Sequence, residues 1–429
     1  MDWFGRARVA FTHAPNPLSL KGKDGLQTDL LKICEQSTPP CRLNPLLFNG
    51  HIQTMWTVTQ PHGPQVYYRR KIFDASHKTY TGTFAVDFAV DPHTDHDEPL
   101  PPRTAYFSDE AFASIGSDDE RPMLIVLHGL SGGSHEVYLR HAIEPLLRDG
   151  GGDWDVCVVN ARGCAHSAIT SGVLFNARAT WDVRQVVNWA RETFPNRPLF
   201  GLGFSLGANI LTNYVGEEGE NCPLTAAVVV GNPFDLQLSS KALQRTWLGK
   251  EVYQRFMGTN MKKLIQRHKE SIEKWTNLDF QGIQNITYLF EFDREVHRTS
   301  RCATWGYPTE EAYYRDASSS DSVLAIRIPF FAISAEDDPI AVKEAVPYQE
   351  FKQNPWTVLC TTSLGGHLSW FEFGGGRWHA HPISNFLKNM ATKVDLSSIH
   401  KPANGKADGN FFQGAEFDPM RRKMEIVLD

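Results

Sequence analysis

The chain has 429 residues, of which 41% are hydrophobic and 21% charged, and its formal net charge is -6. These values are typical of a globular protein that is large enough to bury a sizeable core. The mild acidity argues against a nucleic-acid surface as the main function, because such surfaces are usually basic.

The number and spacing of the cysteines, together with the hydropathy of the chain, indicate where in the cell the protein is expected. Seven cysteines occur without a C-x-x-C pair, and their odd number argues against a disulfide framework and against a zinc site. No stretch reaches the roughly 18 apolar residues that could span a bilayer, and the N-terminal segment lacks the apolar core of a signal peptide. We therefore expect an intracellular protein, cytoplasmic or peripherally associated with lipid.

The first part of the chain is predicted to contain little regular structure before two strands. Residues 1–64 are rich in turn-forming proline and are expected to form an N-terminal arm packed on the body. Residues 65–73 and 82–91 alternate apolar and polar side chains, which predicts half-exposed strands at an antiparallel edge. The Pro- and Asp-rich segment from His93 to Asp119 is interpreted as a solvated loop rather than as a metal site.

From Pro122 the pattern changes to short apolar runs that alternate with helical spacing. The runs MLIVLHGL, DVCVVNARG, PLFGLGF and LTAAVVVGNP predict strands buried on both faces. The segments between them predict amphipathic helices, with Thr180 as a candidate N-cap. The repeated alternation predicts an α/β fold, with a mostly parallel central sheet flanked by helices.

The alternation is interrupted between residues 234 and 322, which have mainly helical patterns. We interpret this segment as a helical cap insertion, residues 65–233 and 323–394 as the core, and residues 395–429 as a polar C-terminal tail. The basic amphipathic stretch 261–275 is interpreted as one helix, with a solvated face or a lipid-surface contact. Six aromatic residues of the insertion would either receive an apolar acyl chain or form the core of the cap: Trp247, Tyr253, Phe256, Trp275, Tyr313 and Tyr314.

The sequence GFSLG, from Gly203 to Gly207, lies between a predicted buried strand and a predicted helix. This is the context of a nucleophile elbow, a strained turn that exposes a serine hydroxyl at the carboxyl edge of a sheet. The small glycines would allow the strand and the helix to approach closely. Ser205 is therefore the candidate nucleophile.

A serine nucleophile needs a general base and a carboxylate that orients the base, which follow it in the chain order Ser, acid, His in this type of site. Asp337 and Asp338 end a predicted buried strand, and His367 follows two glycines after the next strand. We favour Asp338 as the acid because Pro339 directly follows it at a turn. Asp337 would instead cap the following helix or bind a backbone amide.

Acyl chemistry also needs donors for the developing oxyanion. The backbone N–H groups of Leu206, which follows the nucleophile, and of Leu130, which follows the first buried strand, are the expected pair. Arg162 in the sequence NARGC is expected to anchor loops rather than to contact substrate. This chemistry requires neither a metal nor a bound cofactor.

An ordered set of motifs resembles the AB hydrolase 4 family of the α/β-hydrolase superfamily. The motifs are NGHIQT, HGLSGGS, NARGC, GFSLGAN, FEFDREV, YYRDAS, EDDPI and GGHLSW, and they cover about residues 43–387. The resemblance implies Ser205, Asp338 and His367 as nucleophile, acid and base. Members of the family include lipid esterases and phospholipases, and fungal members resemble medium-chain fatty acid ethyl ester synthases that also hydrolyse such esters. Ala161 stands where relatives often carry a larger side chain, so the substrate is less closely indicated than the fold.

These observations predict a serine esterase or acyltransferase. It would act on a small-molecule acyl ester or thioester, with water or an alcohol as acceptor, and would form an acyl-serine intermediate. Three alternatives remain open at this point: an acyltransferase of a biosynthetic pathway, a phospholipase working at a membrane surface, and a non-catalytic binding module on the same fold.

Overall fold

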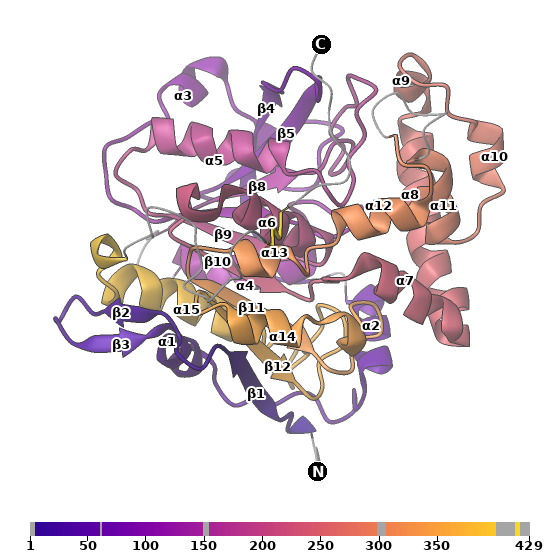
Figure 1. Ribbon diagram of the computed structural model, residues 1–429. Coiled ribbons are helices and arrows are strands. Elements are labelled where there is room, and N and C mark those ends of the chain that lie inside the picture. Colours follow the sequence, from indigo (N-terminus) through magenta and orange to yellow (C-terminus); the bar gives the residue numbers. More distant parts are fainter. Residues whose placement is uncertain (1–4, 61, 149–153, 298–305, 400–416, 421–429) are drawn as a thin grey trace.

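The computed structural model describes residues 5–60, 62–148, 154–297, 306–399 and 417–420. Within these residues, ten strands form one sheet in the order β1-β12-β11-β10-β9-β7-β8-β5-β4-β6 (Figure 1). The strands are β1 (Val9–His13), β4 (Tyr67–Asp74), β5 (Thr83–Val90), β6 (Thr104–Tyr106), β7 (Met123–Leu127), β8 (Asp155–Asn160), β9 (Leu199–Phe204), β10 (Ala226–Val230), β11 (Phe330–Ala335) and β12 (Thr357–Thr362). A separate two-stranded sheet pairs β2 (Ser19–Lys21) with β3 (Gln27–Asp29).

The six strands from β7 to β12 run parallel to one another. Their side chains alternate between two separate apolar cores, one on each face of the sheet. In β7, Leu124 and Val126 belong to one core, whereas Ile125 and Leu127 belong to the other. Burial on both faces explains why these strands have continuous apolar sequences, and it confirms the predicted parallel sheet.

Helices cover both faces of the sheet, as predicted (Figure 1). One face packs against α1 (Leu30–Ser37), α4 (Val137–Arg148) and α15 (Ala380–Lys393). The other face packs against α5 (Trp181–Thr193), α6 (Leu206–Glu218), α13 (Ser322–Ala325) and α14 (Tyr348–Gln353). Thr180 occupies the N-cap position of α5, but its hydroxyl donates to the Glu217 carboxylate, 2.6 Å away, instead of capping the helix.

The N-terminal segment is more closely integrated than the predicted arm. Strand β1 extends the central sheet by pairing antiparallel with β12, and α1 packs on α15. Helix α2 (Gly50–Thr59) begins at an N-cap, Asn49, whose side chain accepts the N–H of Ile52. Strand β1 and helix α1 are therefore joined to β12 and α15 at one edge of the sheet.

The prediction for β4 and β5 was partly wrong. They pair antiparallel, but β5 lies inside the sheet between β8 and β4 and is largely buried. The alternation of polar residues was misleading because Arg70 and Asp87 face each other in a fully buried ion pair, with an N–O distance of 2.6 Å. The edge strand is β6, which lies in the segment interpreted as a solvated loop and is followed by α3 (Asp109–Ala113).

Between β10 and β11 the described chain is helical, with α7 (Leu236–Arg245), η3 (Leu248–Gln254), α8 (Arg255–Arg267), α9 (Lys269–Glu273), α10 (Phe280–Gln284), α11 (Leu289–Val296) and α12 (Glu310–Ala317) preceding α13. Helices α8 to α11 stand together to one side of the sheet (Figure 1). Their apolar residues form a cluster with the loop after β8, including Met261, Ile265 and Phe175. The boundaries proposed for the cap and for the other domains stay a prediction.

The basic stretch 261–275 is two helices rather than one. The chain turns at His268, between α8 and α9, and the Nε2 atom of this residue lies 2.9 Å from the carbonyl oxygen of Gly163. None of the helices in the described ranges combines the length and apolarity needed to cross a bilayer. The six described cysteines are buried and free of disulfide bonds, whereas Cys302 and most of the predicted tail lie outside the described residues. The remaining short turns are η2 (Gly219–Asn221), η4 (Lys343–Ala345) and η5 (Leu396–Ser398).

Candidate active site

The turn between β9 and α6 holds Ser205 in a strained conformation, with φ 51° and ψ -116°. A non-glycine residue in such a region costs on the order of 1–3 kcal/mol and persists only where its surroundings impose it. The N–H of Ser205 donates to the carbonyl of Val230, and its own carbonyl accepts the N–H of Asn209. The elbow predicted from the sequence is present.

The two glycines of the elbow are required by close packing. A Cβ atom on Gly203 would lie 2.7 Å from the Cα of Ala208, and one on Gly207 would lie 2.5 Å from the carbonyl oxygen of Leu127. Both contacts are with backbone, which cannot rotate away as a side chain can. The strand, the turn and the helix therefore approach one another only because these positions lack side chains.

The three residues predicted as a triad meet at the carboxyl edge of the sheet. The Nε2 atom of His367 lies 2.9 Å from the hydroxyl oxygen of Ser205. Its Nδ1 atom lies 2.8 Å from a carboxylate oxygen of Asp338. Because a carboxylate only accepts, Nδ1 carries the proton and donates it to Asp338, which leaves Nε2 to accept from Ser205.

Asp338 is buried, and both of its oxygen atoms have partners. Oδ2 accepts from His367, while Oδ1 accepts the N–H groups of Ile340 and Ala341 at 2.8 and 2.9 Å. Asp337 has the other role that was considered for it, since its Oδ1 accepts the N–H of Gly366 at 2.9 Å. Burial raises the pKa of Asp337 to about 6. The two adjacent carboxylates thus hold two different parts of the His367 loop.

The loop that carries His367 is fastened to α2, a contact that the sequence analysis missed. The N–H of His367 donates to the hydroxyl of Thr54 at 2.9 Å, and this hydroxyl donates to the carbonyl of Gly50 at 2.6 Å. Gln53, which is fully buried, accepts the N–H of Phe371 at 2.9 Å. The signal was present in the motif NGHIQT, which the sequence analysis used only for family resemblance.

The backbone of α2 also approaches the backbone of the segment that follows β11. A Cβ atom on Gly50 would lie 1.9 Å from the carbonyl oxygen of Asp337. No side chain fits at Gly50, so the N-terminus of α2 rests directly on the residue that precedes Asp338. Helix α2 therefore contacts the segments that carry His367 and Asp338.

The two expected oxyanion donors lie beside Ser205. Leu130 and Leu206 line the same cavity as the serine. Leu206 is the first residue of α6, so its N–H has no partner within the helix. Both residues therefore border the space into which an oxyanion formed at Ser205 would project.

The loop of Leu130 is held by His128. The Nε2 atom of this histidine accepts the N–H of Ala161 at 3.0 Å, so Nδ1 carries the proton and donates to the carbonyl of Gly129 at 2.7 Å. Burial lowers the pKa of His128 to about 4, which keeps the ring neutral in this arrangement. The N–H of Gly129 donates to the hydroxyl of Tyr138 at 2.8 Å.

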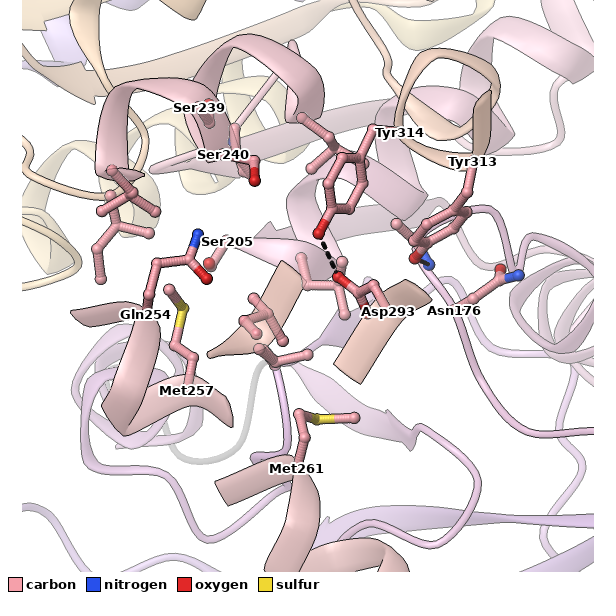
Figure 2. Close-up of a pocket in the computed structure, with 18 of the residues that line it drawn as sticks. Asn176, Ser205, Ser239, Ser240, Gln254, Met257, Met261, Asp293, Tyr313 and Tyr314 are labelled. Carbon is pink, nitrogen blue, oxygen red and sulfur yellow. Dashed lines mark hydrogen bonds between the residues drawn. The ribbon is translucent and has the colours of Figure 1, made fainter. Parts of the chain in front are cut away.

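A cavity lies in front of Ser205 and is partly open to solvent. Most of its wall is apolar and comes from the inserted helices, including Leu236, Leu243, Met257, Met261 and Leu289. Figure 2 shows Met257 and Met261 along one side of this space and Asp293, Tyr313 and Tyr314 along another. Of the six aromatic residues considered for the insertion, only the two tyrosines line the cavity; Trp247, Phe256 and Trp275 are exposed.

Arg162 anchors loops, as predicted. Its guanidinium group donates to both carboxylate oxygens of Asp182, at 2.9 and 2.8 Å, and to the carbonyl of Tyr80 at 2.9 Å. Arg162 is not among the residues that line the cavity. Among the described residues, no group of three or more His, Cys, Asp or Glu side chains is placed to hold a metal ion.

Comparison with known proteins agrees with this architecture. The alpha/beta hydrolase fold family matches residues 122–372. A monoacylglycerol lipase of Saccharomyces cerevisiae is 38% identical over 377 residues, covering 82% of this chain and 81% of that protein. The medium-chain fatty acid ethyl ester synthase/esterase 2 of the same yeast is 31% identical over 394 residues, covering 82% and 86%.

Similarity over a shorter part of the chain extends beyond yeast. The embryogenesis-associated protein EMB8 of Picea glauca is 34% identical over 290 residues, covering 67% of this chain and 62% of that protein. Among solved structures, an esterase of Pyrococcus furiosus matches with a TM-score of 0.39 and 15% identity, covering 71% of this chain and 84% of that chain. The family match and the two yeast relatives agree with the motifs found in the sequence: the chain belongs to the alpha/beta hydrolase family, in its AB hydrolase 4 branch.

Proposed function

We propose that the protein hydrolyses acyl esters through an acyl-serine intermediate, with Ser205 as nucleophile, His367 as general base and Asp338 as the carboxylate that orients the base. The observation that carries the proposal is the pair of contacts made by one imidazole, 2.9 Å to the serine hydroxyl and 2.8 Å to the carboxylate. A free serine hydroxyl is a weak nucleophile at neutral pH, and this arrangement supplies what it lacks.

In the first half-reaction, Ser205 Oγ forms a bond to the ester carbonyl carbon while its proton passes to His367 Nε2. The carbonyl oxygen becomes an oxyanion, which the N–H groups of Leu130 and Leu206 would stabilise. When the tetrahedral intermediate collapses, the bond between carbon and the alkoxy oxygen breaks. The leaving alcohol takes the proton from His367, and the acyl group remains on Ser205.

In the second half-reaction, water attacks the acyl-serine and gives a proton to His367. Collapse of the second tetrahedral intermediate releases the fatty acid and returns the proton to Ser205. Asp338 remains ionised throughout and stabilises the imidazolium that forms in each half-reaction. Its two backbone N–H donors, from Ile340 and Ala341, keep the carboxylate in place while the charge on the ring changes.

The substrate class follows from the cavity and from the relatives. An apolar wall with two methionines suits a flexible acyl chain. The two yeast relatives are named for the hydrolysis of monoacylglycerol and for the synthesis and hydrolysis of medium-chain fatty acid ethyl esters. We therefore propose a small-molecule ester of a fatty acid, of medium chain length, as the substrate.

Acyl transfer to an alcohol is a second candidate activity, because one of these relatives is named as a synthase as well as an esterase. The same acyl-serine would then be attacked by an alcohol instead of water. Supplying an ester with and without ethanol and measuring free acid against ethyl ester tests this. Ethyl ester accumulating at the expense of free acid supports transfer, and free acid alone at every ethanol concentration contradicts it.

A fluorophosphonate probe tests the proposed nucleophile directly. The folded wild-type protein should be labelled at Ser205, and Ser205→Ala should be neither labelled nor active on a fatty acyl ester while it unfolds at the same urea concentration. A wild-type protein that is folded, unlabelled and inactive would contradict the proposed function. So would a Ser205→Ala variant that keeps wild-type turnover.

A further inference from the structure

A second apolar pocket adjoins the cavity in front of Ser205, and no step of the proposed reaction uses it. We call it the second arm. It shares two wall residues with the main cavity, Phe175 and Leu206. The rest of its wall comes from the carboxyl ends of β7 and β8, from the segment before α5 and from the first turns of α5 and α6. The second arm therefore lies beside the elbow, under the ends of β7 and β8.

The polar side chains that line the second arm are already hydrogen-bonded. Both ring nitrogens of His128 pair with backbone groups. Both carboxylate oxygens of Asp182 accept from Arg162. The side-chain amide of Asn160 accepts at its oxygen and donates at its nitrogen. A hydroxyl group or a water molecule in this arm would gain little from these side chains, and burying a polar group without a partner is unfavourable. The second arm therefore suits hydrocarbon.

The position of His367 decides which half of an ester can reach the second arm. A Cβ atom on Gly231, the residue after β10, would lie 3.6 Å from the imidazole ring of His367. A Cβ atom on Gly129, which lines the second arm after β7, would lie 3.4 Å from the Cβ of Ser205. Strand β9, which leads to Ser205, lies between β10 and β7 in the sheet. The imidazole and the second arm are therefore on opposite sides of the serine.

The acyl half of the substrate is the half directed toward the second arm. The leaving alcohol receives its proton from Nε2 of His367, so its oxygen lies beside the ring. The acyl chain is attached to the same carbonyl carbon and extends to the other side, toward β7 and β8. An apolar surface continues in that direction, because Leu206 and Ala161 pack against the cluster that contains Met261 and Phe175.

Ala161 follows β8 and lines the second arm with a single methyl group. Its backbone is held at both ends: its N–H donates to Nε2 of His128 at 3.0 Å, and its carbonyl accepts the N–H of Cys164 at 2.8 Å. The residue is only partly buried. Because the backbone is fixed, a larger side chain at this position would occupy the second arm.

We infer that the second arm receives the acyl chain of the substrate, and that Ala161 determines how long a chain it accepts. The inference rests on the proposed function for the orientation of the ester, but filling of the arm can also be measured without turnover. Each methylene that enters the arm should raise kcat/KM by about fourfold, the factor that corresponds to the transfer of one methylene out of water.

Hydrolysis of a series of esters tests the role of Ala161. Wild type, Ala161→Leu and Leu236→Phe are assayed on the ethyl esters of straight-chain acids from butanoate to tetradecanoate. Ala161→Leu should shift the acid with the highest kcat/KM by about three carbons toward shorter chains, because the added side-chain carbons take the place of methylenes. An unchanged preference in folded Ala161→Leu overturns the inference.

The matched control for this series is Leu236→Phe. This substitution adds the same number of side-chain carbons as Ala161→Leu, but Leu236 lines the main cavity and not the second arm. The preferred acid should therefore stay the same in Leu236→Phe. An equal shift in both variants would show that any added bulk shortens the preferred chain, and would overturn the assignment to the second arm.

A pair of isomeric esters assigns the arm to the acyl half. Ethyl decanoate and decyl acetate contain the same atoms, but the long chain belongs to the acid in one and to the alcohol in the other. Ala161→Leu should lower the ratio of kcat/KM for ethyl decanoate to that for decyl acetate by about tenfold or more. A ratio that is unchanged or raised overturns the inference.

Val183→Ala provides a second variant, which does not depend on the folding of Ala161→Leu. Val183 is a buried residue of α5 that lines the second arm, so its truncation enlarges the arm. The preferred acid should become longer, the opposite of the effect of Ala161→Leu. Urea unfolding verifies that each variant is folded, and a folded Val183→Ala that prefers the same or a shorter acid contradicts the inference.

Binding to Ser205→Ala separates the second arm from the chemistry. Calorimetry with the ethyl esters from butanoate to decanoate should show an affinity that rises by about fourfold for each methylene until the arm is full. The rise should end at a shorter acid in the double variant of Ser205→Ala and Ala161→Leu, and the same rise in both proteins overturns the inference. If wild-type Ser205 is not labelled and no ester is cleaved, the proposed function fails, while these affinities still report on the second arm.

Discussion

The hydroxyl of Thr54 accepts the backbone N–H of His367 at 2.9 Å, across 313 residues of sequence. Thr54 lies in α2, outside the region matched by the alpha/beta hydrolase family. Its hydroxyl is also fixed, because it donates to Gly50 in the same helix. The proposed general base is therefore held in place by a helix from the N-terminal segment, and this part of the chain is needed for a preorganised site.

Replacing Thr54 by valine should impair catalysis more than binding. The variant keeps the shape of the side chain but leaves the N–H of His367 without an acceptor, which costs about 1–3 kcal/mol when the group is buried. We expect kcat to fall by about tenfold or more while KM changes little, because the loop no longer holds the imidazole against Ser205. Steady-state kinetics on a fatty acyl ester measures the effects on kcat and on KM separately. Thr54→Ser, which keeps the hydroxyl, should recover most of the activity, and a Thr54→Val enzyme with wild-type kcat would contradict this role.

Removing the proposed nucleophile and the proposed base together should lower kcat no further than removing one of them. Residues that act as a unit have strongly non-additive effects, and losses on the order of a million-fold in kcat have been seen for either member alone. We expect Ser205→Ala, His367→Ala and the double variant to share the same residual rate. Single-turnover assays with equal protein concentrations make the comparison. A double variant that is slower than both single variants by the product of their effects would argue that the two residues work independently.

The free energy of unfolding should depend on pH because the carboxyl group of Asp337 titrates differently in the folded and unfolded states. Burial raises the pKa of this carboxyl to about 6, above its ordinary value of 3.8, so between these values the folded protein binds more protons than the unfolded chain. The contribution of Asp337 is therefore fully present below about pH 4 and is lost as the pH rises through about 6. Asp337→Asn, which retains an acceptor for Gly366, should gain stability relative to wild type between pH 4 and pH 7. Urea unfolding at both ends of this range tests the sign, and a difference that is constant with pH would show that the pKa is not raised.

The elbow glycines should not tolerate alanine. A Cβ atom at position 203 or 207 would meet backbone atoms at 2.7 Å or less, and relief requires the strand and the helix to separate. We expect Gly203→Ala and Gly207→Ala each to lower the free energy of unfolding by about 2–4 kcal/mol and to reduce labelling of Ser205. The matched control is Gly376→Ala, where the added Cβ meets only a carboxylate oxygen of Glu372. Wild-type stability in either elbow variant would contradict the packing argument.

Replacing one member of the buried ion pair between Arg70 and Asp87 should destabilise the protein more than replacing both. Both side chains are inaccessible to solvent, and Asp87 also accepts hydrogen bonds from Ser134 and Asn160. Replacing Asp87 by leucine leaves a buried guanidinium unpaired, which should lower the free energy of unfolding by about 3–5 kcal/mol. Arg70→Met combined with Asp87→Leu should be less destabilised than Asp87→Leu alone. Chemical denaturation of the three variants provides the comparison, and strict additivity would argue against a coupled pair.

Much of the core fold was predictable because local patterns and tertiary burial agree there. Strands β7 to β11 lie within continuous apolar runs, and a parallel strand covered on both faces needs such a run. The sequence pattern did not identify β5 as a buried strand, because Asp87 places a polar side chain in a buried position. A pattern of side-chain types cannot show that a distant arginine neutralises a carboxylate. Strand β6 is only three residues long, and such a strand forms only because β4 is beside it to supply hydrogen bonds.

The sequence by itself determined the chemical types and their order along the chain: a serine between glycines after a buried strand, a carboxylate at the end of another, and a histidine after two glycines. It also determined the elbow, because glycine is the only residue without a Cβ atom to clash there. Only the tertiary structure decided that Asp338 rather than Asp337 reaches the imidazole, that α2 fastens the His367 loop, and that a buried carboxylate lies in the wall of the cavity. These features depend on distances between segments far apart in the chain, and such distances are set by how the sheet, the N-terminal helix and the inserted helices pack together.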